Sequence, residues 1–233
     1  MDGCKNIFIV LLFMSAVAMV PDYCFAQGNV YLGITPGVNF VKYNTSPFSI
    51  PNSDPNTIIQ NGAGTAPLLG VSCQVNVGNP INNNFIVFEG FYDSKLAKFA
   101  NISNANNEIA ASLSYVLLNI GYKYNFNDGP MVNGPAIELS AYMGYKLIGN
   151  FTYTANNISP PIDGAKTWRF GLRGQFVYDI PISPLWVVSP LVGFDYPFTK
   201  VDNTSRSWMA SSVYIGISFL IAIEDLTPSL ICQ

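Results

Sequence analysis

Residues 168–180 read WRFGLRGQFVYDI, and residues 186–198 read WVVSPLVGFDYPF. In both segments most bulky apolar residues stand at every second position. Trp168 and Phe170 fall on one face of an extended chain, whereas Arg169 falls on the other. This alternation is the period of a β-strand, whose successive side chains point to opposite faces, and it is not the period of a helix. The two segments therefore predict two neighbouring strands.

The same alternation recurs along the chain and predicts eight strands. Their approximate ranges are 29–43, 66–78, 84–94, 108–126, 135–149, 166–180, 185–199 and 207–223. Most exceed the usual 5–6 residues of a globular strand, and a tilted strand that crosses a bilayer needs about 9–11. Both faces are apolar near 84–93, where we assign Glu89 and Asp93 to the interior. The phase slips between Ile109 and Tyr115, and a β-bulge there would restore the register.

The connections between these strands alternate in length. Long connections are expected at 44–65, 95–107, 150–165 and 200–206, and short ones at 79–83, 127–134 and 181–184. Because neighbouring strands are antiparallel, all the long connections fall at one end of the sheet. Five Asn-x-Ser/Thr triplets lie in or beside the long connections and begin at Asn44, Asn101, Asn150, Asn157 and Asn203. Because these connections are rich in Asn, Ser and Thr, chance is enough to explain the triplets.

The composition excludes several classes of protein. Charged residues make up 11% of the chain and hydrophobic residues 49%, whereas an ordinary soluble domain carries about 25% charged residues. Lys and Arg number 11 against 14 Asp and Glu, a net charge of −3, which argues against nucleic-acid binding. The chain contains no histidine, so mechanisms that need an imidazole base or ligand are excluded. Its apolar, aromatic character also argues against disorder.

The first residues predict a targeting segment. Residues 7–20 form an apolar run that is too short for a spanning helix but suits a secretory signal. Cleavage is expected before Gln27, which divides the chain into a signal peptide at 1–26, a barrel at 27–223 and a short tail at 224–233. Cys73 and Cys232 would remain, too few for a disulfide scaffold or a zinc site.

Two sets of residues indicate which face meets lipid. Trp168 and Tyr178 lie ten residues apart on one strand, as do Trp186 and Tyr196 on the next. At about 3.3 Å per residue and a tilt of about 45°, ten residues span roughly 23 Å, close to the apolar band of about 25 Å in membrane barrels. These four aromatics are expected to form an outward girdle.

The charged residues of the strands should then face inward. A charge facing hydrocarbon costs several kcal/mol, and eight strands leave an interior just wide enough for side chains. We expect a paired charge network that fixes the barrel; a gated ion path is the alternative, and catalytic carboxylates have no supporting spacing. The network is predicted to comprise Glu89, Glu138, Lys146, Arg169, Arg173 and Asp179.

The signal peptide, the eight amphipathic strands and the alternating connections resemble the small outer-membrane barrels of the OmpA and OmpX type. Residues 214–219, YIGISF, resemble the assembly signal of a last strand, aromatic-x-Gly-x-x-aromatic, although residues 220–233 follow it here. The resemblance implies an all-β, eight-stranded antiparallel up-and-down transmembrane β-barrel in a bacterial outer membrane. Four long outer loops would face the cell exterior and three short turns the periplasm.

In such a fold, function is expected in the loops. The sequence favours a non-catalytic structural, adhesive or antigenic protein without a cofactor or metal. The expected partners are membrane lipid and an unknown external ligand of the loops, without nucleic acid, and the chain is expected to be a monomer. Two alternatives stay open, namely a narrow ion or small-solute pore and a soluble exported lipocalin-like barrel that binds an apolar ligand.

Overall fold

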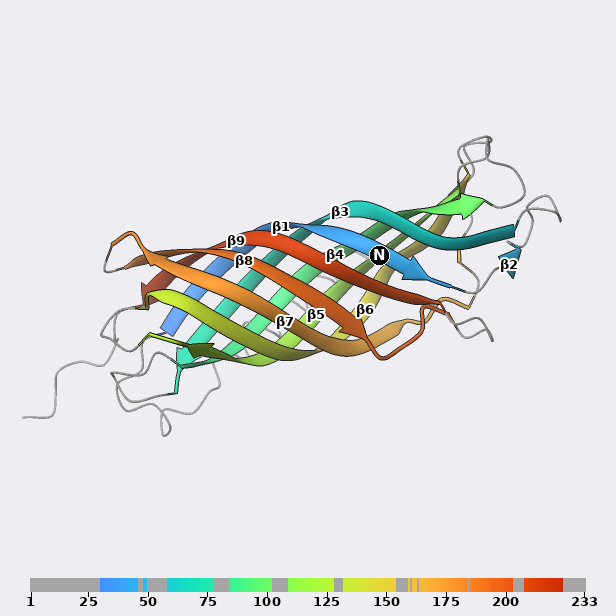
Figure 1. Cartoon of the computed structure of the whole chain (residues 1–233). Helices are drawn as coiled ribbons and strands as arrows, with labels where there is room; N and C mark the ends of the chain where they lie inside the picture. Colours follow the sequence, from blue (N-terminus) through green and yellow to red (C-terminus); the bar gives the residue numbers. More distant parts are fainter. Residues whose placement is uncertain are drawn as a thin grey trace, which may run out of the picture.

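The protein is an antiparallel β-barrel, shown in Figure 1 as a computed structural model. The structure describes residues 30–45, 48–49, 58–77, 84–101, 109–127, 132–153, 159, 161–162, 164–183, 185–202 and 208–223. These residues form nine strands: β1 (Val30–Asn44), β2 (Phe48–Ser49), β3 (Ile58–Asn76), β4 (Phe85–Asn101), β5 (Ile109–Asn125), β6 (Gly134–Tyr153), β7 (Trp168–Pro181), β8 (Trp186–Pro197) and β9 (Met209–Ile223). The predicted signal peptide and C-terminal tail lie outside the described residues.

Eight of these strands close into a barrel, which confirms the predicted fold. Each strand pairs with the next in the chain, and β1 pairs with both β3 and β9, so the first and last long strands meet. The two-residue β2 pairs only with β3. The strands wind obliquely around an elongated barrel (Figure 1). No helix in the described part of the chain is long and apolar enough to span a membrane.

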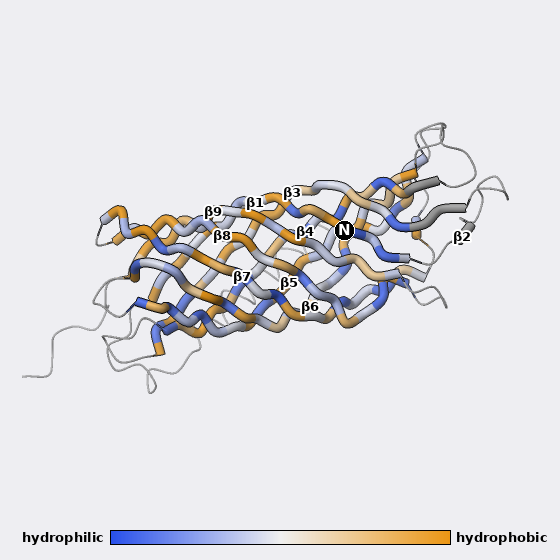
Figure 2. Tube along the Cα trace, viewed as in Figure 1, coloured by the Kyte–Doolittle hydropathy of each residue, from blue (hydrophilic) through white to orange (hydrophobic). Residues whose placement is uncertain are grey.

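The outer wall of the barrel is apolar. Along β7, outward and inward positions alternate, with Phe176 at 47% exposure and Arg173 at 2%. The colours of Figure 2 change along each strand in the same rhythm. Large apolar side chains are exposed on every long strand, for example Ile34, Leu69, Leu139 and Phe194. The outer wall therefore lacks the polar surface that a lipocalin-like barrel needs in water.

Three strands run several residues further than the sequence predicts. β3 begins at Ile58 rather than at 66, β4 continues to Asn101 rather than ending at 94, and β6 continues to Tyr153 rather than ending at 149. The connection between β4 and β5 is therefore confined to residues 102–108. Glycines near 62–64 and the polar composition near 95–98 resemble loop sequence, but the alternation continues through them, with Leu96 exposed and Ala97 buried. The connections that follow β1, β4, β6 and β8 nevertheless join strands at one end of the barrel, called here the loop end, and those that follow β3, β5 and β7 join them at the other, called the turn end. The connection 102–108 is shorter than the turn-end connections 77–84 and 126–133, so the predicted alternation of long and short connections fails there.

The predicted irregularity near Tyr115 exists, but it belongs to the partner strand. Ser114 pairs with Ile148 and Tyr115 pairs with Lys146, so Leu147 of β6 is the extra residue. β5 keeps its phase throughout, because Ile109 and the residues at every second position after it all point inward. The phase slip in the sequence was therefore a misreading: the barrel interior is itself apolar at this level, which removes the contrast between the two faces.

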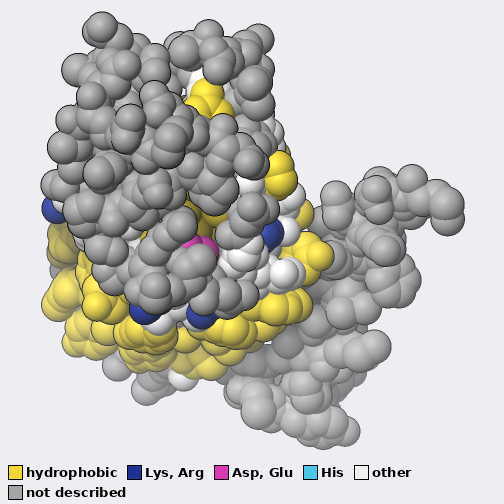
Figure 3. All heavy atoms as spheres, turned by 90° about the vertical axis from the view of Figure 1, so that its right-hand side faces the viewer, with side chains coloured by type: hydrophobic (Ala, Val, Ile, Leu, Met, Phe, Trp, Pro, Cys, Tyr) yellow, Lys and Arg dark blue, Asp and Glu magenta, His cyan; other side chains and the backbone are white. Residues whose placement is uncertain are grey.

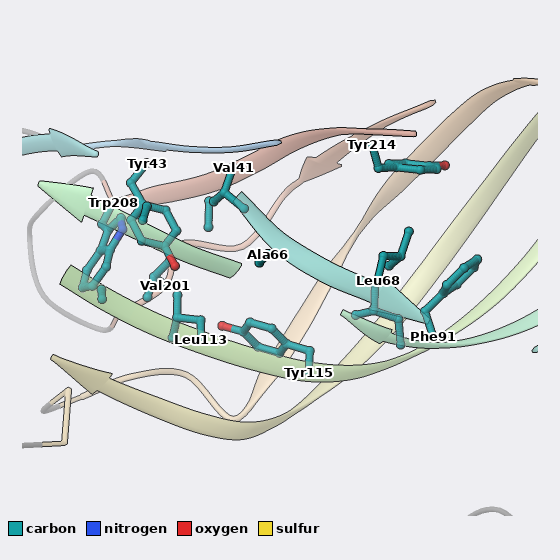
Figure 4. Close-up of a cluster of buried hydrophobic side chains, with 14 of the residues drawn as sticks. Val41, Tyr43, Ala66, Leu68, Phe91, Leu113, Tyr115, Val201, Trp208 and Tyr214 are labelled. Carbon is teal, nitrogen blue, oxygen red and sulfur yellow. The ribbon is translucent and has the colours of Figure 1, made fainter. Parts of the chain in front are cut away.

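The interior is layered from one end to the other. β4 displays the order on its inward face, which from the turn end reads Phe85, Val87, Glu89, Phe91, Asp93, Lys95, Ala97 and Phe99. At the turn end, Phe85 and Val87 belong to a buried apolar cluster with Tyr31, Val132, Val187 and Leu220. A larger apolar cluster fills the rest of the interior around the charges and reaches the loop end, where Figure 4 shows Trp208 beside Tyr43. The charged residues thus lie between apolar layers.

Candidate functional site in the barrel interior

Four charged side chains form a central ion cluster in the loop-end half of the interior. β4 supplies Asp93 and Lys95, β7 supplies Arg169 and β8 supplies Asp195. Lys95 Nζ lies 2.8 Å from Asp195 Oδ2 and 3.3 Å from Asp93 Oδ2. Arg169 contacts the same two carboxylates, through Nη2 at 2.7 Å and Nη1 at 3.2 Å. Two cations and two anions therefore neutralise one another, and each side chain is at most 4% exposed.

Neutral groups supply further hydrogen bonds to this cluster. Asn39 Nδ2 donates to Asp93 Oδ1 at 2.6 Å, and Lys95 Nζ donates to Ser212 Oγ at 2.6 Å. The carbonyl of Ala210 accepts a 2.6 Å hydrogen bond from the Arg169 guanidinium. The donors and acceptors come from β1, β4, β7, β8 and β9, so one network links five strands across the interior. Such bonds offset part of the cost of burying charges away from water.

A second group surrounds Arg173 near the middle of the barrel. Its guanidinium lies between two aromatic rings, 4.1 Å from the centroid of Phe91 and 4.2 Å from that of Tyr214. This arrangement is a double cation–π contact, which is strongest in a desolvated site. Among the described residues, no hydrogen-bond partner lies within reach of Arg173 Nε or Nη1. The rings therefore contribute much of the local stabilisation of this cation.

Two carboxyls accompany this single guanidinium. Asn119 Nδ2 donates to Glu89 Oε2 at 3.0 Å, and Glu89 and Glu138 are both buried near the Arg173 guanidinium. Glu138 is 2% exposed, and its Oε1 has no hydrogen-bond partner among the described residues. The site thus places two acidic groups side by side with one cation, in contrast to the balanced central ion cluster.

A separate ion pair lies close to the turn end. Lys123 Nζ is 2.7 Å from Asp179 Oδ2 and 2.9 Å from Asp179 Oδ1, and neither side chain is exposed. Ser189 Oγ donates to Asp179 Oδ1 at 2.6 Å. Lys123 also lies 5.8 Å from the centroid of the Phe85 ring, which belongs to the turn-end apolar cluster.

Five of the six predicted interior charges lie buried within these groups, namely Glu89, Glu138, Arg169, Arg173 and Asp179. Lys146 lies apart: it is half-buried at the loop end, and its Nζ donates to the carbonyl of Ala165 at 2.8 Å. It fixes the segment before β7 instead of joining the buried ion pairs. The four predicted girdle residues all point outward, at 47–57% exposure; they are Trp168, Tyr178, Trp186 and Tyr196.

Sequence reasoning left four interior charges out of the predicted network. Lys123 and Asp195 stand at polar positions of alternating strands, and Asp93 was assigned inward, so the sequence carried a signal for each. Lys95 was missed because the strand was ended at 94. Partners could not be read from the sequence, since Asp93 and Arg169 are 76 residues apart and meet only when the barrel closes.

Comparisons with known proteins find similarity to solved structures only. No protein-family model matches the sequence, and no curated protein matches it. The structure is similar to that of Ail, the attachment invasion locus protein of Yersinia pestis, in its complex with the heparin analogue sucrose octasulfate. The sequence identity is 9%, the match covers 82% of this chain and 98% of Ail, and the TM-score is 0.44. It is also similar to the structure of Neisserial surface protein A, with a sequence identity of 9% and a TM-score of 0.43; the match covers 84% of this chain and 98% of that protein.

A more distant similarity connects the chain to the translocator domain of the autotransporter NalP from Neisseria meningitidis. Identity is 11%, coverage is 94% of this chain and 95% of that domain, and the TM-score is 0.28. At these identities the similarities concern the fold only.

The chemistry available to this interior is that of paired, dehydrated charges. No group of three or more potential metal ligands occurs among the described residues. Among the described residues, the charged atoms are buried within the barrel wall and lie between apolar clusters. The arrangement is suited to holding eight strands in register.

Proposed function

We propose that this chain is a bacterial outer-membrane barrel that holds its loops at the cell surface and performs no catalysis. The observation that carries the proposal is the distribution of apolar and charged residues, which is the reverse of that in a soluble barrel: apolar residues cover the outer wall and charged residues lie inside. Trp168 is 48% exposed, while its neighbour Arg169 is 4% exposed. In water this arrangement would expose the apolar wall and bury charges at a cost, whereas in lipid it meets both requirements.

The aromatic girdle supports the same proposal. Trp168 and Tyr178 lie near the two ends of the apolar stretch of β7, and Trp186 and Tyr196 lie near those of β8; Ile180 and Phe198 extend the two stretches by one outward position each. The separation of roughly 23 Å fits the apolar thickness of a membrane barrel. Amphipathic aromatic rings favour the two head-group levels, where the ring meets the acyl chains and the polar atom meets water. We assign the four residues to these levels.

The filled interior favours a structural role over a pore. An ion entering from the loop end would meet the buried rings of Tyr43, Phe99 and Trp208, and then the central ion cluster. From the turn end it would meet the cluster around Phe85 and Leu220. Displacing these side chains costs packing and ion pairing at both ends. Any specific recognition is therefore assigned to the outer connections, as a surface attachment or antigenic role.

The location is tested in intact cells. The folded chain should partition into detergent and run faster on a gel when unheated than when boiled, as closed barrels do. Protease added to whole cells should cut the outer connections 45–57 or 154–167, while a periplasmic marker protein stays intact. Cleavage only after lysis would count against outward-facing loops, and a soluble, unpartitioned chain would revive the lipocalin-like alternative.

The absence of a pore is tested separately. The purified, folded chain is inserted in a planar lipid bilayer, and current is recorded at both polarities. A silent bilayer with verified insertion is the expected result. Discrete, chain-dependent openings would replace the structural role with the narrow-pore alternative.

A further inference from the structure

The charges buried within the strands do not balance. Among the described residues, the strands bury five acidic and four basic side chains: Glu89, Asp93, Glu138, Asp179, Asp195, Lys95, Lys123, Arg169 and Arg173. Asp202, another buried carboxylate, lies outside the strands, where its backbone forms an isolated β-bridge with Ala165 at the loop end. On the loop-end face drawn in Figure 3, the visible acidic atoms lie in the middle of the barrel, while apolar atoms cover its wall. The strands therefore enclose one acidic group more than they have cations to match.

The unmatched carboxyl lies near the middle of the barrel. Lys123 matches Asp179, with 2.7 Å between Nζ and Oδ2, and the central ion cluster contains two cations and two carboxylates. Glu89 and Glu138 then have Arg173 as the remaining cation, and both carboxyls are buried near it. Burying an unmatched charge away from water is costly, and most costly in a barrel surrounded by lipid. This carboxyl therefore needs a positive partner or must lose its own charge.

The polar atoms around the two carboxyls lack a donor. Glu89 pairs across the sheet with Ser72 of β3 and with Asn119 of β5, and all three side chains are buried. Among the described residues, no hydrogen-bond partner lies within reach of Glu138 Oε1, Asn119 Oδ1 or Ser72 Oγ. Each of these atoms can accept a hydrogen bond, and the oxygens of an ionised carboxylate can only accept. Because a buried acceptor without a donor is costly, the site favours an added hydrogen-bond donor.

The titratable neighbours of the two carboxyls cannot neutralise both. They are Lys123 of β5, Arg173 of β7 and Tyr214 of β9. Lys123 Nζ contacts both oxygens of Asp179, and the Tyr214 hydroxyl donates to Gln175 Oε1 at 3.2 Å. The carboxylates of the central ion cluster also lie near Arg173, but the two cations of that cluster balance them. Among the described side chains near the pair, none is left to neutralise the second carboxyl.

We propose that Glu89 and Glu138 bind one proton between them in the folded barrel, so that one carboxyl is neutral and the other is the counterion of Arg173. The proton removes the excess negative charge, and the neutral carboxyl gains an O–H donor for a neighbouring acceptor. A metal cation would need oxygens that replace its hydration shell on all sides, whereas the rings of Phe91 and Tyr214 occupy this level of the interior. The inference goes beyond the proposed function, because it holds for the closed barrel whichever way its loops face.

The first experiment uses the full chain, folded in a detergent without ester groups and measured by infrared spectroscopy at neutral pH. A protonated carboxyl has a C=O stretch that a carboxylate lacks, so difference spectra between the unmodified chain and a variant isolate the bound proton. The unmodified chain should show this band. Glu138→Gln and Glu89→Gln should each lose it, because the carboxyl that remains is then the counterion of Arg173.

The matched control removes a carboxyl together with its cation. Lys123→Met with Asp179→Leu leaves Glu89 and Glu138 in place and should keep the band. Unheated gel mobility shows whether each chain forms a closed barrel. If one Gln variant fails to close, the other variant and the band of the unmodified chain decide the result.

The second experiment measures proton uptake during folding. Above the range in which a free glutamate titrates, about pH 4.3, the unfolded chain has released both protons, whereas the folded pair retains one. The folding equilibrium constant of the unmodified chain, divided by that of Glu138→Gln, should therefore fall about tenfold for each pH unit until the folded pair also releases its proton. Urea unfolding in lipid vesicles across a pH series measures both chains. Parallel pH dependence of the two chains would contradict the proposal.

Three further outcomes would overturn it. The first is a closed, unmodified barrel without a protonated-carboxyl band at neutral pH. The second is a band that persists in both Gln variants, since the proton would then be on another group. The third is a loss of stability when choline replaces sodium and potassium at equal ionic strength, seen for the unmodified chain but not for Glu138→Gln. That result would assign the site to a metal cation instead of a proton.

Discussion

At the scale of single residues, the interior charges differ in how evenly they are balanced. Lys123 and Asp179 form an ion pair that is separate from the central ion cluster and has no exposed surface. Substituting either residue therefore removes the main partner of the other. Removing one member of a buried pair leaves an uncompensated charge, whereas removing both can be nearly neutral. The pair therefore offers a clean measurement of what ionic contacts contribute to this barrel.

We expect Lys123→Met to lower the free energy of unfolding by about 3–5 kcal/mol, because Asp179 then stays buried without its cation. The double variant Lys123→Met with Asp179→Leu should recover most of this loss. Urea unfolding of the barrel in lipid vesicles, followed by gel mobility, measures both. A double variant as unstable as the single one would show that the pair is not the origin of the loss.

Glu138 should respond in the opposite direction. Two buried carboxyls lie near one guanidinium here, so Glu138→Gln removes one acidic group, keeps the shape and supplies an N–H donor near Glu89. The expected stability is equal to or higher than that of the unmodified chain. Arg173→Met, which removes the cation between Phe91 and Tyr214, should instead cost about 3–5 kcal/mol. A marked loss from Glu138→Gln in the same unfolding assay would contradict this account of the site.

At the scale of strands, the closure of the barrel depends on close contact between β1 and β9. Gly37 pairs with Gly216, and a Cβ at Gly37 would lie 2.6 Å from the carbonyl oxygen of Ile215 and 3.3 Å from the Cα of Gly216. These are backbone atoms, which cannot move aside without separating the strands. Gly90 of β4 is different, since its added Cβ would meet only Val71 Cγ2 at 3.6 Å.

We therefore expect Gly37→Ala to destabilise the barrel by about 1–3 kcal/mol through overpacking. Gly90→Ala is the matched control and should leave stability unchanged or slightly raised, because alanine restricts the unfolded chain. The fraction of closed barrel after refolding, read from unheated gel mobility across a urea series, compares the two. Equal losses at both positions would mean that strand propensity, and not the closure seam, decides the effect.

The strands also show how far the sequence predicts this structure. Alternation reports the contrast between an apolar outer wall and polar groups inside, so it defined β7, where Phe170 faces out and Arg169 faces in. It failed between Ile109 and Leu113, because the interior there is as apolar as the outer wall. It also ended β4 before Lys95, because a lysine in a polar stretch resembles a loop residue until its buried partners are known. Pairing across the barrel is a three-dimensional property that one strand does not encode.

At the scale of the whole molecule, the interior contains two kinds of barrier in series. The loop end contains packed aromatic rings. The ring centroid of Trp208 lies 5.6 Å from that of Tyr43, edge-on, and 5.8 Å from that of Phe151, stacked. Further inside, Lys95 reaches across the interior to Asp195, and Arg169 reaches across it to Asp93. The first barrier depends on packing and the second on charge pairing. Loss of one should therefore reduce stability without opening a continuous path.

Trp208→Ala tests this separation. Truncating a fully buried tryptophan should cost about 3–5 kcal/mol, yet bilayers containing the variant should stay silent, because the central ion cluster still spans the interior. Trp186→Ala, at an outward position of 48% exposure, is the matched control; it should cost less and also stay silent. Discrete openings with Trp208→Ala but not with Trp186→Ala would show that the aromatic layer alone keeps the barrel closed, and that the ion pairs beneath it part readily enough for ions to pass.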